Sequence, residues 1–183
     1  LRAKRALVYE GAMLDIRQLP CLSDNYGFLV RDRETGRTAC IDTPDADAIL
    51  AEAGRIGWDI HEIWNTHWHP DHAGGNAAIK AKTGAIVIGP GEVSRIGAAP
   101  DRVVHPGDMV RLGQAQAEVV DVGGHTLEHI AFHFAEARTA FVGDAVFAMG
   151  CQSRPPFPAG ATAESRDLLC RRRAASACCY ARS

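Results

Sequence analysis

The chain has 183 residues and a mass of 19.7 kDa, enough for one domain with a buried core. Hydrophobic residues make up 46% of it and charged residues 23%, as in an ordinary globular domain. The net charge of −2 provides no general attraction to nucleic acid or to anionic lipid, and no run of about 18 apolar residues predicts a membrane span. We therefore expect neither a nucleic-acid partner nor a membrane partner.

The first third of the chain predicts strands followed by a helix. Strand-like patterns occur at residues 14–19, 26–31 and 38–42. Residues 45–56 carry apolar side chains at helical spacing, which predicts a helix. Residues 1–12 precede the first of these strands, and we assign them to an N-terminal extension of a catalytic domain at 13–151.

The rest of the chain predicts more strands with a helix among them. Further strands are expected at 60–65, 85–88, 110–112, 117–122, 130–134 and 139–142. A helix is expected at 75–82. Many strands with a few interleaved helices indicate an α/β sandwich. The chain has no glycine-rich phosphate-binding loop of the GxGxxG or GxxxxGK[ST] type, so nucleotide binding is not indicated.

The segment Thr-His-Trp-His-Pro-Asp-His, from Thr66 to His72, holds three of the eight histidines. In an extended segment, His67 and His69 would lie on one side because they are two residues apart. Asp71 and His72 follow a proline, where the chain can turn and bring two more side chains to the same place. Imidazole and carboxylate suit a divalent ion such as zinc, and the segment follows a predicted strand, where α/β sheets usually bind ligands. The alternative, a polar surface loop, fits this spacing less well.

Two later loops could complete a metal centre. His125 stands in a glycine-flanked loop after one predicted strand, and Asp144 follows another. Either residue alone is a weak signal, since a histidine or aspartate in a turn is more often a cap or solvated. Beside the histidine segment they become candidate ligands, and a carboxylate such as that of Asp144 can bridge two ions.

These motifs resemble the metallo-β-lactamase superfamily and, within it, the glyoxalase II or hydroxyacylglutathione hydrolase group. The superfamily signature Thr-His-x-His-x-Asp-His is met by the segment at 66–72. Motifs of the group (Cys-Leu-x-Asp-Asn-Tyr, Ile-Asp-Thr-Pro, Ala-Gly-Gly-Asn and Gly-Asp-x-x-Phe-x-x-Gly-Cys) are matched at 21–26, 41–44, 73–76 and 143–151. The resemblance covers about residues 13–151 and implies a metallo-β-lactamase-like αββα sandwich, truncated at its C-terminus.

The resemblance implies a cofactor of two divalent metal ions, with zinc expected and iron or manganese left open. It places one ion on His67, His69 and His125, the other on Asp71 and His72, and Asp144 between them as a bridge. Asp71 and Asp144 are the residues expected to act in catalysis. Of the remaining histidines, we expect roles beside the site for His129 and His133, and surface positions for His61 and His105.

The implied reaction is hydrolysis of a glutathione thioester. A hydroxide activated by the two ions would attack the thioester carbonyl, and glutathione would leave as a thiolate. The resemblance implies S-lactoylglutathione as the substrate, lactate and glutathione as the products, and a role in methylglyoxal detoxification. We expect a cytoplasmic monomer.

The resemblance ends at Cys151. Members of the group continue to a last metal-binding histidine in a Gly-His-Glu motif and to a glutathione-binding helical region, whereas no histidine follows His133 here. Residues 152–183 are rich in Arg, Cys, Ala and Ser, and we assign them to a non-family tail. Our hypothesis is a reading-frame shift near codon 152. The alternative is a divergent, short member with a tail of its own.

Two other functions stay open. One is a different hydrolase of the superfamily or a mononuclear-iron persulfide dioxygenase, against which the motifs at 21–26 and 41–44 argue. Metal count and identity would distinguish it. The other is a metal-binding remnant without turnover, which the missing histidine and the missing substrate region favour.

Overall fold

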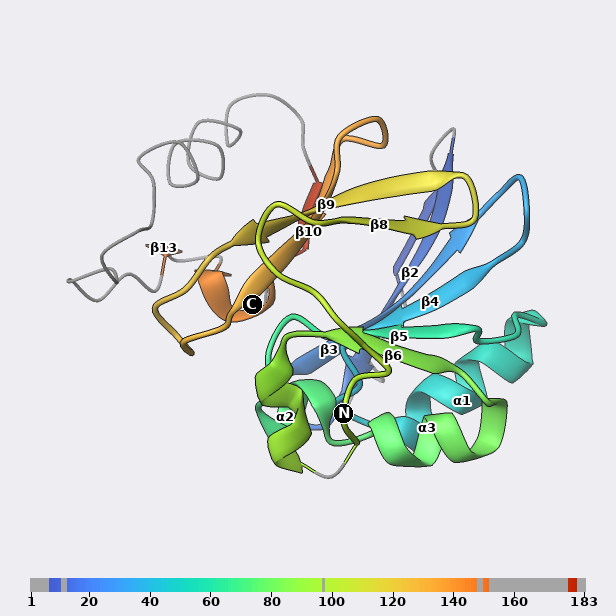
Figure 1. Ribbon diagram of the computed structural model, residues 1–183. Coiled ribbons are helices and arrows are strands. Elements are labelled where there is room, and N and C mark those ends of the chain that lie inside the picture. The colour runs from blue at the N-terminus through green and yellow to red at the C-terminus, as the bar shows by residue number, and fades with distance from the viewer. Residues whose placement is uncertain (1–6, 11–12, 97, 148–149, 152–177, 181–183) are drawn as a thin grey trace.

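Two β-sheets pack face to face, and helices cover the outer face of the first sheet (Figure 1). The computed structural model describes residues 7–10, 13–96, 98–147, 150–151 and 178–180. The sandwich brings together the ends of strands that lie far apart in the sequence.

The first sheet has seven strands in chain order. They are β1 (Leu7–Glu10), β2 (Leu14–Cys21), β3 (Asn25–Asp32), β4 (Thr38–Ile41), β5 (Glu62–Trp64), β6 (Ile86–Gly89) and β7 (Arg102–Val103). Strands β1 to β4 are antiparallel, whereas β4 to β7 are parallel. Parallel strands need crossover connections, and these contain α1 (Ala46–Ile56), α2 (Pro70–Ala73), α3 (Asn76–Thr83) and the 3₁₀ helix η1 (Gly91–Ile96).

The second sheet has five strands in the order β14-β11-β10-β9-β8. Its members are β8 (Met109–Leu112), β9 (Ala115–Asp121), β10 (Ile130–Phe134), β11 (Thr139–Phe141) and β14 (Cys178–Tyr180). Strand β14 pairs with β11 in parallel, and the other pairs are antiparallel. After β11 come the 3₁₀ turn η2 (Gly143–Ala145) and a small hairpin of β12 (Val146–Phe147) and β13 (Gly150–Cys151).

One hydrophobic core lies between the two sheets and another between the first sheet and the helices. In the first core, Trp64 packs on Phe132 and Phe134, with ring centroids 5.0 and 5.7 Å away. The second core receives apolar side chains from α1, α2 and α3. Helix α1 begins where the Asp45 carboxylate accepts the Ala48 N–H at 3.1 Å.

The predicted α/β sandwich fold is confirmed. Every strand and helix predicted from the sequence is present, with ends shifted by up to two residues. Residues 7–10, which lie in the predicted N-terminal extension, form the edge strand β1. The predicted non-family tail lies outside the described residues except for 178–180, which form β14. None of the helices in the described ranges is long and apolar enough to cross a lipid bilayer.

Candidate metal centre

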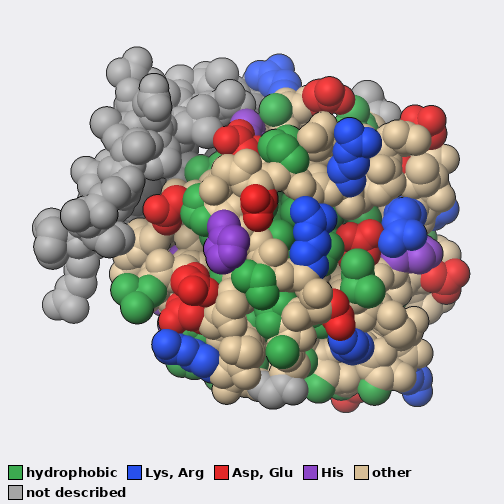
Figure 2. Space-filling view, viewed as in Figure 1, with side chains coloured by type: hydrophobic (Ala, Val, Ile, Leu, Met, Phe, Trp, Pro, Cys, Tyr) green, Lys and Arg blue, Asp and Glu red, His purple; other side chains and the backbone are tan. Residues whose placement is uncertain are grey.

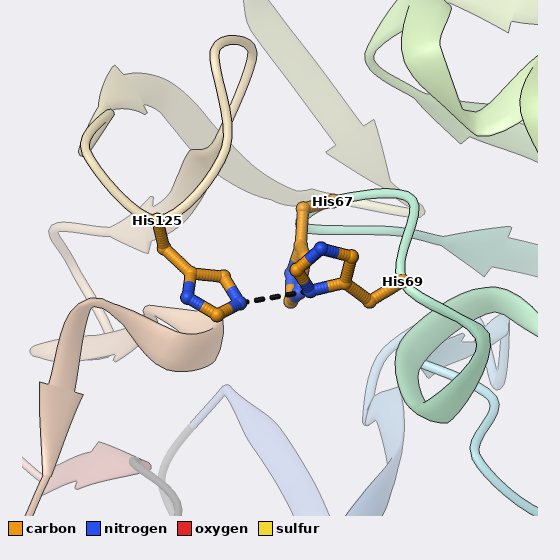
Figure 3. A group of neighbouring side chains, drawn as sticks. All are labelled: His67, His69 and His125. Carbon is orange, nitrogen blue, oxygen red and sulfur yellow. Dashed lines mark hydrogen bonds between the residues drawn. The ribbon is translucent and has the colours of Figure 1, made fainter.

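The predicted metal ligands meet at one end of the sandwich. His67 and His69 lie in the loop after β5, and Asp71 and His72 lie in the short helix α2 that follows it. The second sheet contributes a histidine from the loop after β9. Figure 3 shows His67, His69 and His125 reaching toward one another from these two loops.

The first group of donors is His67, His69 and His125, whose candidate ligand atoms all lie within 4.8 Å of one another. His125 Nε2 is 2.9 Å from His69 Nδ1. The ring of His67 lies 4.8 Å from that of His69 and 5.0 Å from that of His125, centroid to centroid. Three imidazoles at this spacing could bind one divalent ion.

The second group is His67, His72 and Asp144. Its candidate ligand atoms also lie within 4.8 Å of one another, and all three residues are buried. Asp144 Oδ1 lies 3.1 Å from His72 Nε2, and its Oδ2 lies 3.3 Å from His125 Nε2. One carboxylate therefore reaches both groups, as a bridging ligand would. Asp71 belongs to neither group, but its Oδ2 lies 3.8 Å from His72 Nε2.

A single buried carboxylate, Asp42, orients two of these histidines. It accepts hydrogen bonds from the Thr66 N–H, the Thr66 hydroxyl and His72 Nδ1, each at 2.9 Å. The proton on Nδ1 leaves Nε2 of His72 as its metal-binding atom. Because the Thr66 hydroxyl donates to Asp42, it can accept from His67 Nδ1, which is 3.0 Å away. Nε2 of His67 is then also left with a free lone pair.

Asn25, the first residue of β3, holds Asp71. Its side-chain amide donates to the backbone carbonyl of Asp71 at 2.7 Å and to Asp71 Oδ2 at 2.9 Å. Asn25 is buried, whereas the side chain of Asp71 is 36% exposed. The Asp71 carboxylate is therefore held at its inner oxygen while it borders solvent.

Gly143 lets η2 approach the histidine loop. Its φ of +51° is a left-handed conformation, and a Cβ on this residue would collide with Thr66 Oγ1 and His129 Nε2. Glycine is therefore required next to Asp144 for both steric and conformational reasons.

Burial and charge shift the pKa of the buried histidines in opposite directions. Burial and the neighbouring histidines, His72 foremost, hold the pKa of His67 far below its usual range. Burial also lowers the pKa of His72, but the carboxylates of Asp42 and Asp144 outweigh it and raise that pKa to about 10. A metal ion would therefore meet a neutral His67 and would displace a proton from His72.

The other histidines belong to neither donor group. His129 is fully buried, with its ring 4.6 Å from that of His67, and burial followed by the charge of His125 lowers its pKa to about 3. His133 is buried on β10. His105 is exposed, as expected, but His61 is only partly exposed because its Nδ1 accepts the N–H of Thr38 at 3.2 Å.

The donor set fits a divalent metal ion. Among the described residues, His67 Nε2 is buried and has no hydrogen-bond partner. A buried acceptor without a partner is costly, and a metal ion would use its lone pair. Imidazole and carboxylate oxygen are ligands that zinc, iron and manganese all accept.

The orienting residues were not predicted. Asp42 and Asn25 fall within the motifs at 41–44 and 21–26, but we assigned them no role. A signal was available for Asp42, since it directly follows a buried strand next to β5. Asn25 offered no such signal, because its contact with Asp71 spans 46 positions.

Two packed sheets with histidines and carboxylates gathered at one end define a metal-binding α/β sandwich protein. The chain belongs to the metallo-beta-lactamase superfamily, whose sequence profile matches residues 28–176.

Within the superfamily, the chain is similar in sequence to proteins named hydroxyacylglutathione hydrolase. The chain is 61% identical over 140 residues to the hydroxyacylglutathione hydrolase of Hyphomonas neptunium, which is 76% of this chain and 54% of that protein. It is 59% identical over 139 residues to the enzyme of the same name from Erythrobacter litoralis, covering 76% of this chain and 55% of that protein. The chain thus spans about half the length of these relatives.

Solved structures share the fold. ETHE1 from Myxococcus xanthus superposes with a TM-score of 0.64 at 30% identity, covering 85% of this chain and 68% of that one. BJP-1, a subclass B3 metallo-beta-lactamase of Bradyrhizobium japonicum, superposes with a TM-score of 0.68 at 20% identity, covering 96% of this chain and 76% of that one.

Proposed function

We propose that this chain carries the metal centre of a hydroxyacylglutathione hydrolase, which splits the thioester S-lactoylglutathione into lactate and glutathione. The observation that carries the proposal is the position of Asp144, whose two oxygens reach His72 and His125 and so join two donor groups. The high identity to curated relatives of that name supports the choice of thioester.

The proposed centre holds two ions, with zinc the metal we favour. His67, His69 and His125 would hold one, His72 and Asp71 the other, and Asp144 both. When bound, such ions lower the pKa of water toward neutrality and polarise a carbonyl oxygen.

The chain's own residues orient the reactants. The partly exposed Asp71 carboxylate, held by Asn25, can accept a hydrogen bond from a nucleophilic water and aim its lone pair at the thioester carbon. The departing glutathione sulfur leaves as a thiolate, which is a better leaving group than an amine. No protonated side chain is therefore needed at the leaving atom, and the buried, neutral His67 is free to act as a ligand alone.

We also propose that the protein is a monomer in the cytoplasm. Cys21 and Cys40 are free, buried thiols, and burial raises the pKa of Cys21 to about 11, which fits a reducing compartment. Acidic and basic side chains are intermixed on the face seen in Figure 2, which argues against a large apolar contact there. Light scattering during gel filtration would test the monomer.

A second candidate is a metal-binding chain without turnover. It is favoured by one observation: Asp71, the expected ligand of the second ion, belongs to neither donor group. A persulfide dioxygenase is less well supported, since the relatives at 61% and 59% identity are named hydroxyacylglutathione hydrolases.

The deciding experiment is hydrolysis of S-lactoylglutathione by the zinc-loaded chain, followed through release of the glutathione thiol. Turnover that Asp144→Asn abolishes, and that Asp101→Asn on a remote surface leaves intact, supports the proposal. Bound zinc without turnover supports the second candidate. Failure to bind any divalent metal refutes both.

A further inference from the structure

The 3₁₀ helix η1 stands between the two loops that carry the more exposed histidines. It follows β6 in the first sheet and packs beside α2, as Figure 1 shows. His69 comes from the loop before α2, and His125 comes from the loop between β9 and β10. The two loops follow strands of different sheets, and the two histidines are 56 positions apart in the sequence.

One end of η1 is tied to the loop that carries His125. The N–H of Glu92 donates to Glu128 Oε2 at 2.8 Å, and the N–H of Glu128 donates to Glu92 Oε2 at 3.3 Å. Each glutamate thus binds the backbone of the other. The exchange joins the last part of the β9–β10 loop to the first turn of η1.

The other end of η1 is tied to the loop that carries His69. Arg95 Nη2 lies 2.8 Å from Glu92 Oε1, and the Arg95 guanidinium carbon lies 5.1 Å from the centre of the Trp68 ring. The Trp68 ring in turn meets that of His69 edge-on, with centroids 4.7 Å apart. The contacts form an unbroken path from one loop to the other.

We propose that Glu128, Glu92 and Arg95 form a clamp that positions His125 against His69, which places them in the role of positioning residues. The inference rests on the proposed metal centre, because the clamp would act on the ion that these two histidines share. Its physical basis is preorganisation: two ligands on separate sheets bind an ion more tightly when their loops are already held at the right distance.

The clamp should govern metal affinity rather than stability. Arg95 and Glu128 are exposed, and an ion pair with an exposed partner contributes little to the free energy of unfolding. Residues that orient metal ligands from outside, in contrast, commonly change metal affinity by about 10- to 100-fold. The two quantities can be measured separately on the same variants.

The test is zinc binding by the full chain in competition with a chromogenic chelator. We expect Glu128→Ala and Arg95→Ala each to lower the affinity for one of the two zinc ions by about tenfold. The affinity for the other zinc ion should be unchanged. The double variant should lose less than the product of the two effects, because the residues act along one path. Glu128→Gln keeps an acceptor for the Glu92 N–H and should restore the affinity.

Asp101→Ala is the matched control. Asp101 is also an exposed carboxylate that accepts a backbone N–H, from Val87 at 2.7 Å, and binds a basic side chain, Lys80. It joins α3 to β6 away from the metal centre, so its loss should leave both zinc equivalents at wild-type affinity. If Glu128→Ala and Arg95→Ala bind zinc like this control, the clamp is refuted.

A readout without metal separates failure of the clamp from failure of the proposed function. In the metal-free chain, the nuclear Overhauser effect between the His69 and His125 rings should weaken in the Glu128→Ala/Arg95→Ala double variant. If it is unchanged, the clamp is wrong even where zinc binds. If the wild-type chain binds no zinc but this effect is lost in the variant, the proposed function fails and the clamp stands.

Discussion

The metal centre has a buried half and an open half, and the two are held by different means. His72 and Asp144 have side chains that are 7% and 4% exposed, whereas those of His125 and Asp71 are 18% and 36% exposed. The buried half depends on charged and hydroxyl hydrogen bonds centred on Asp42. The open half depends on an amide and on surface contacts. Substitutions at the two halves should therefore have effects on zinc binding and turnover that differ in kind as well as in size.

Burial explains the difference. A polar group inside the sandwich needs a partner, so the inner ligands sit in a network in which each hydrogen bond also sets a tautomer. The outer ligands border the side from which a substrate must approach, and they have to leave room for it. The buried half therefore fixes the orientation of the metal ligands, and the open half gives the substrate access to the metal centre.

Asp42→Asn should have the largest effect. If the new amide donates toward Thr66 Oγ1, the hydroxyl turns to donate to His67 Nδ1, and the proton of that ring moves to Nε2. Two zinc equivalents should be lost and hydrolysis abolished, because Asp42 orients His67 through Thr66 and His72 directly, and these two histidines would hold different ions. Zinc content by elemental analysis and the ring-nitrogen shifts of the imidazoles check the expectation.

Asp32→Asn is the control for that change. Asp32 is equally buried and also accepts three hydrogen bonds, from the Thr35 N–H, the Thr35 hydroxyl and the Gln114 N–H. It joins the tip of the β3–β4 loop to the β8–β9 turn, and no metal ligand is among its partners. It should lower stability without changing zinc content. Equal zinc loss in both variants would mean that Asp42 acts only on the fold.

Gly143→Ala should have the next largest effect on zinc binding. The added Cβ would press on Thr66 Oγ1 and His129 Nε2 and so displace Asp144, which weakens the link between the two halves. Gly84→Ala is matched in conformation, since Gly84 has φ +73° with open space around the missing Cβ. That control should lose only about 1 kcal/mol of stability and no zinc. Similar zinc affinity in the two variants would contradict the steric argument.

Asn25→Ala probes the open half. It frees the Asp71 carboxylate, so we expect turnover to fall by about tenfold while the equivalent bound by the three histidines is retained. The measurement is kcat beside zinc stoichiometry. Asn25→Asp would place a second carboxylate against Asp71 and should be worse than Asn25→Ala. A wild-type kcat in both variants would show that Asp71 needs no support.

The strands and the ligand types were predictable from the sequence, but the support around them was not. Alternating apolar residues located β5, and the spacing of His67 and His69 located the site beyond it. A two-residue strand such as β7 and a 3₁₀ helix such as η1 carry no period that a pattern can reveal. Asp42 contacts residues 24 and 30 positions away, so its role appears only after the sheets are assembled.

The pH dependence of stability in the metal-free chain should give the smallest effect, and it isolates the buried half. The folded pKa of His129 is about 3, below its ordinary 6.5, so below pH 6.5 the unfolded chain binds a proton that the folded chain does not. Stability therefore falls as the pH drops from 6.5 toward 3. Going from pH 7.5 to 5.5 should cost about 1.4 kcal/mol for this histidine.

His72 affects the pH dependence of stability in the opposite direction. The profile therefore has an acid limb to which His129 contributes and an alkaline limb due to His72, which can be tested separately. Its folded pKa of about 10 means that its stabilising contribution is complete below pH 6.5 and is lost as the pH rises toward 10. The midpoint of thermal unfolding, measured from pH 5 to 9, should thus fall on both sides of about pH 6.5. His129→Gln should reduce the acid limb without removing it, because the lowered pKa of His67 contributes to the same limb. Zinc should remove the alkaline limb, because zinc takes the place of the His72 proton. An acid limb that survives unchanged in His129→Gln would assign it to other buried groups, His67 first among them.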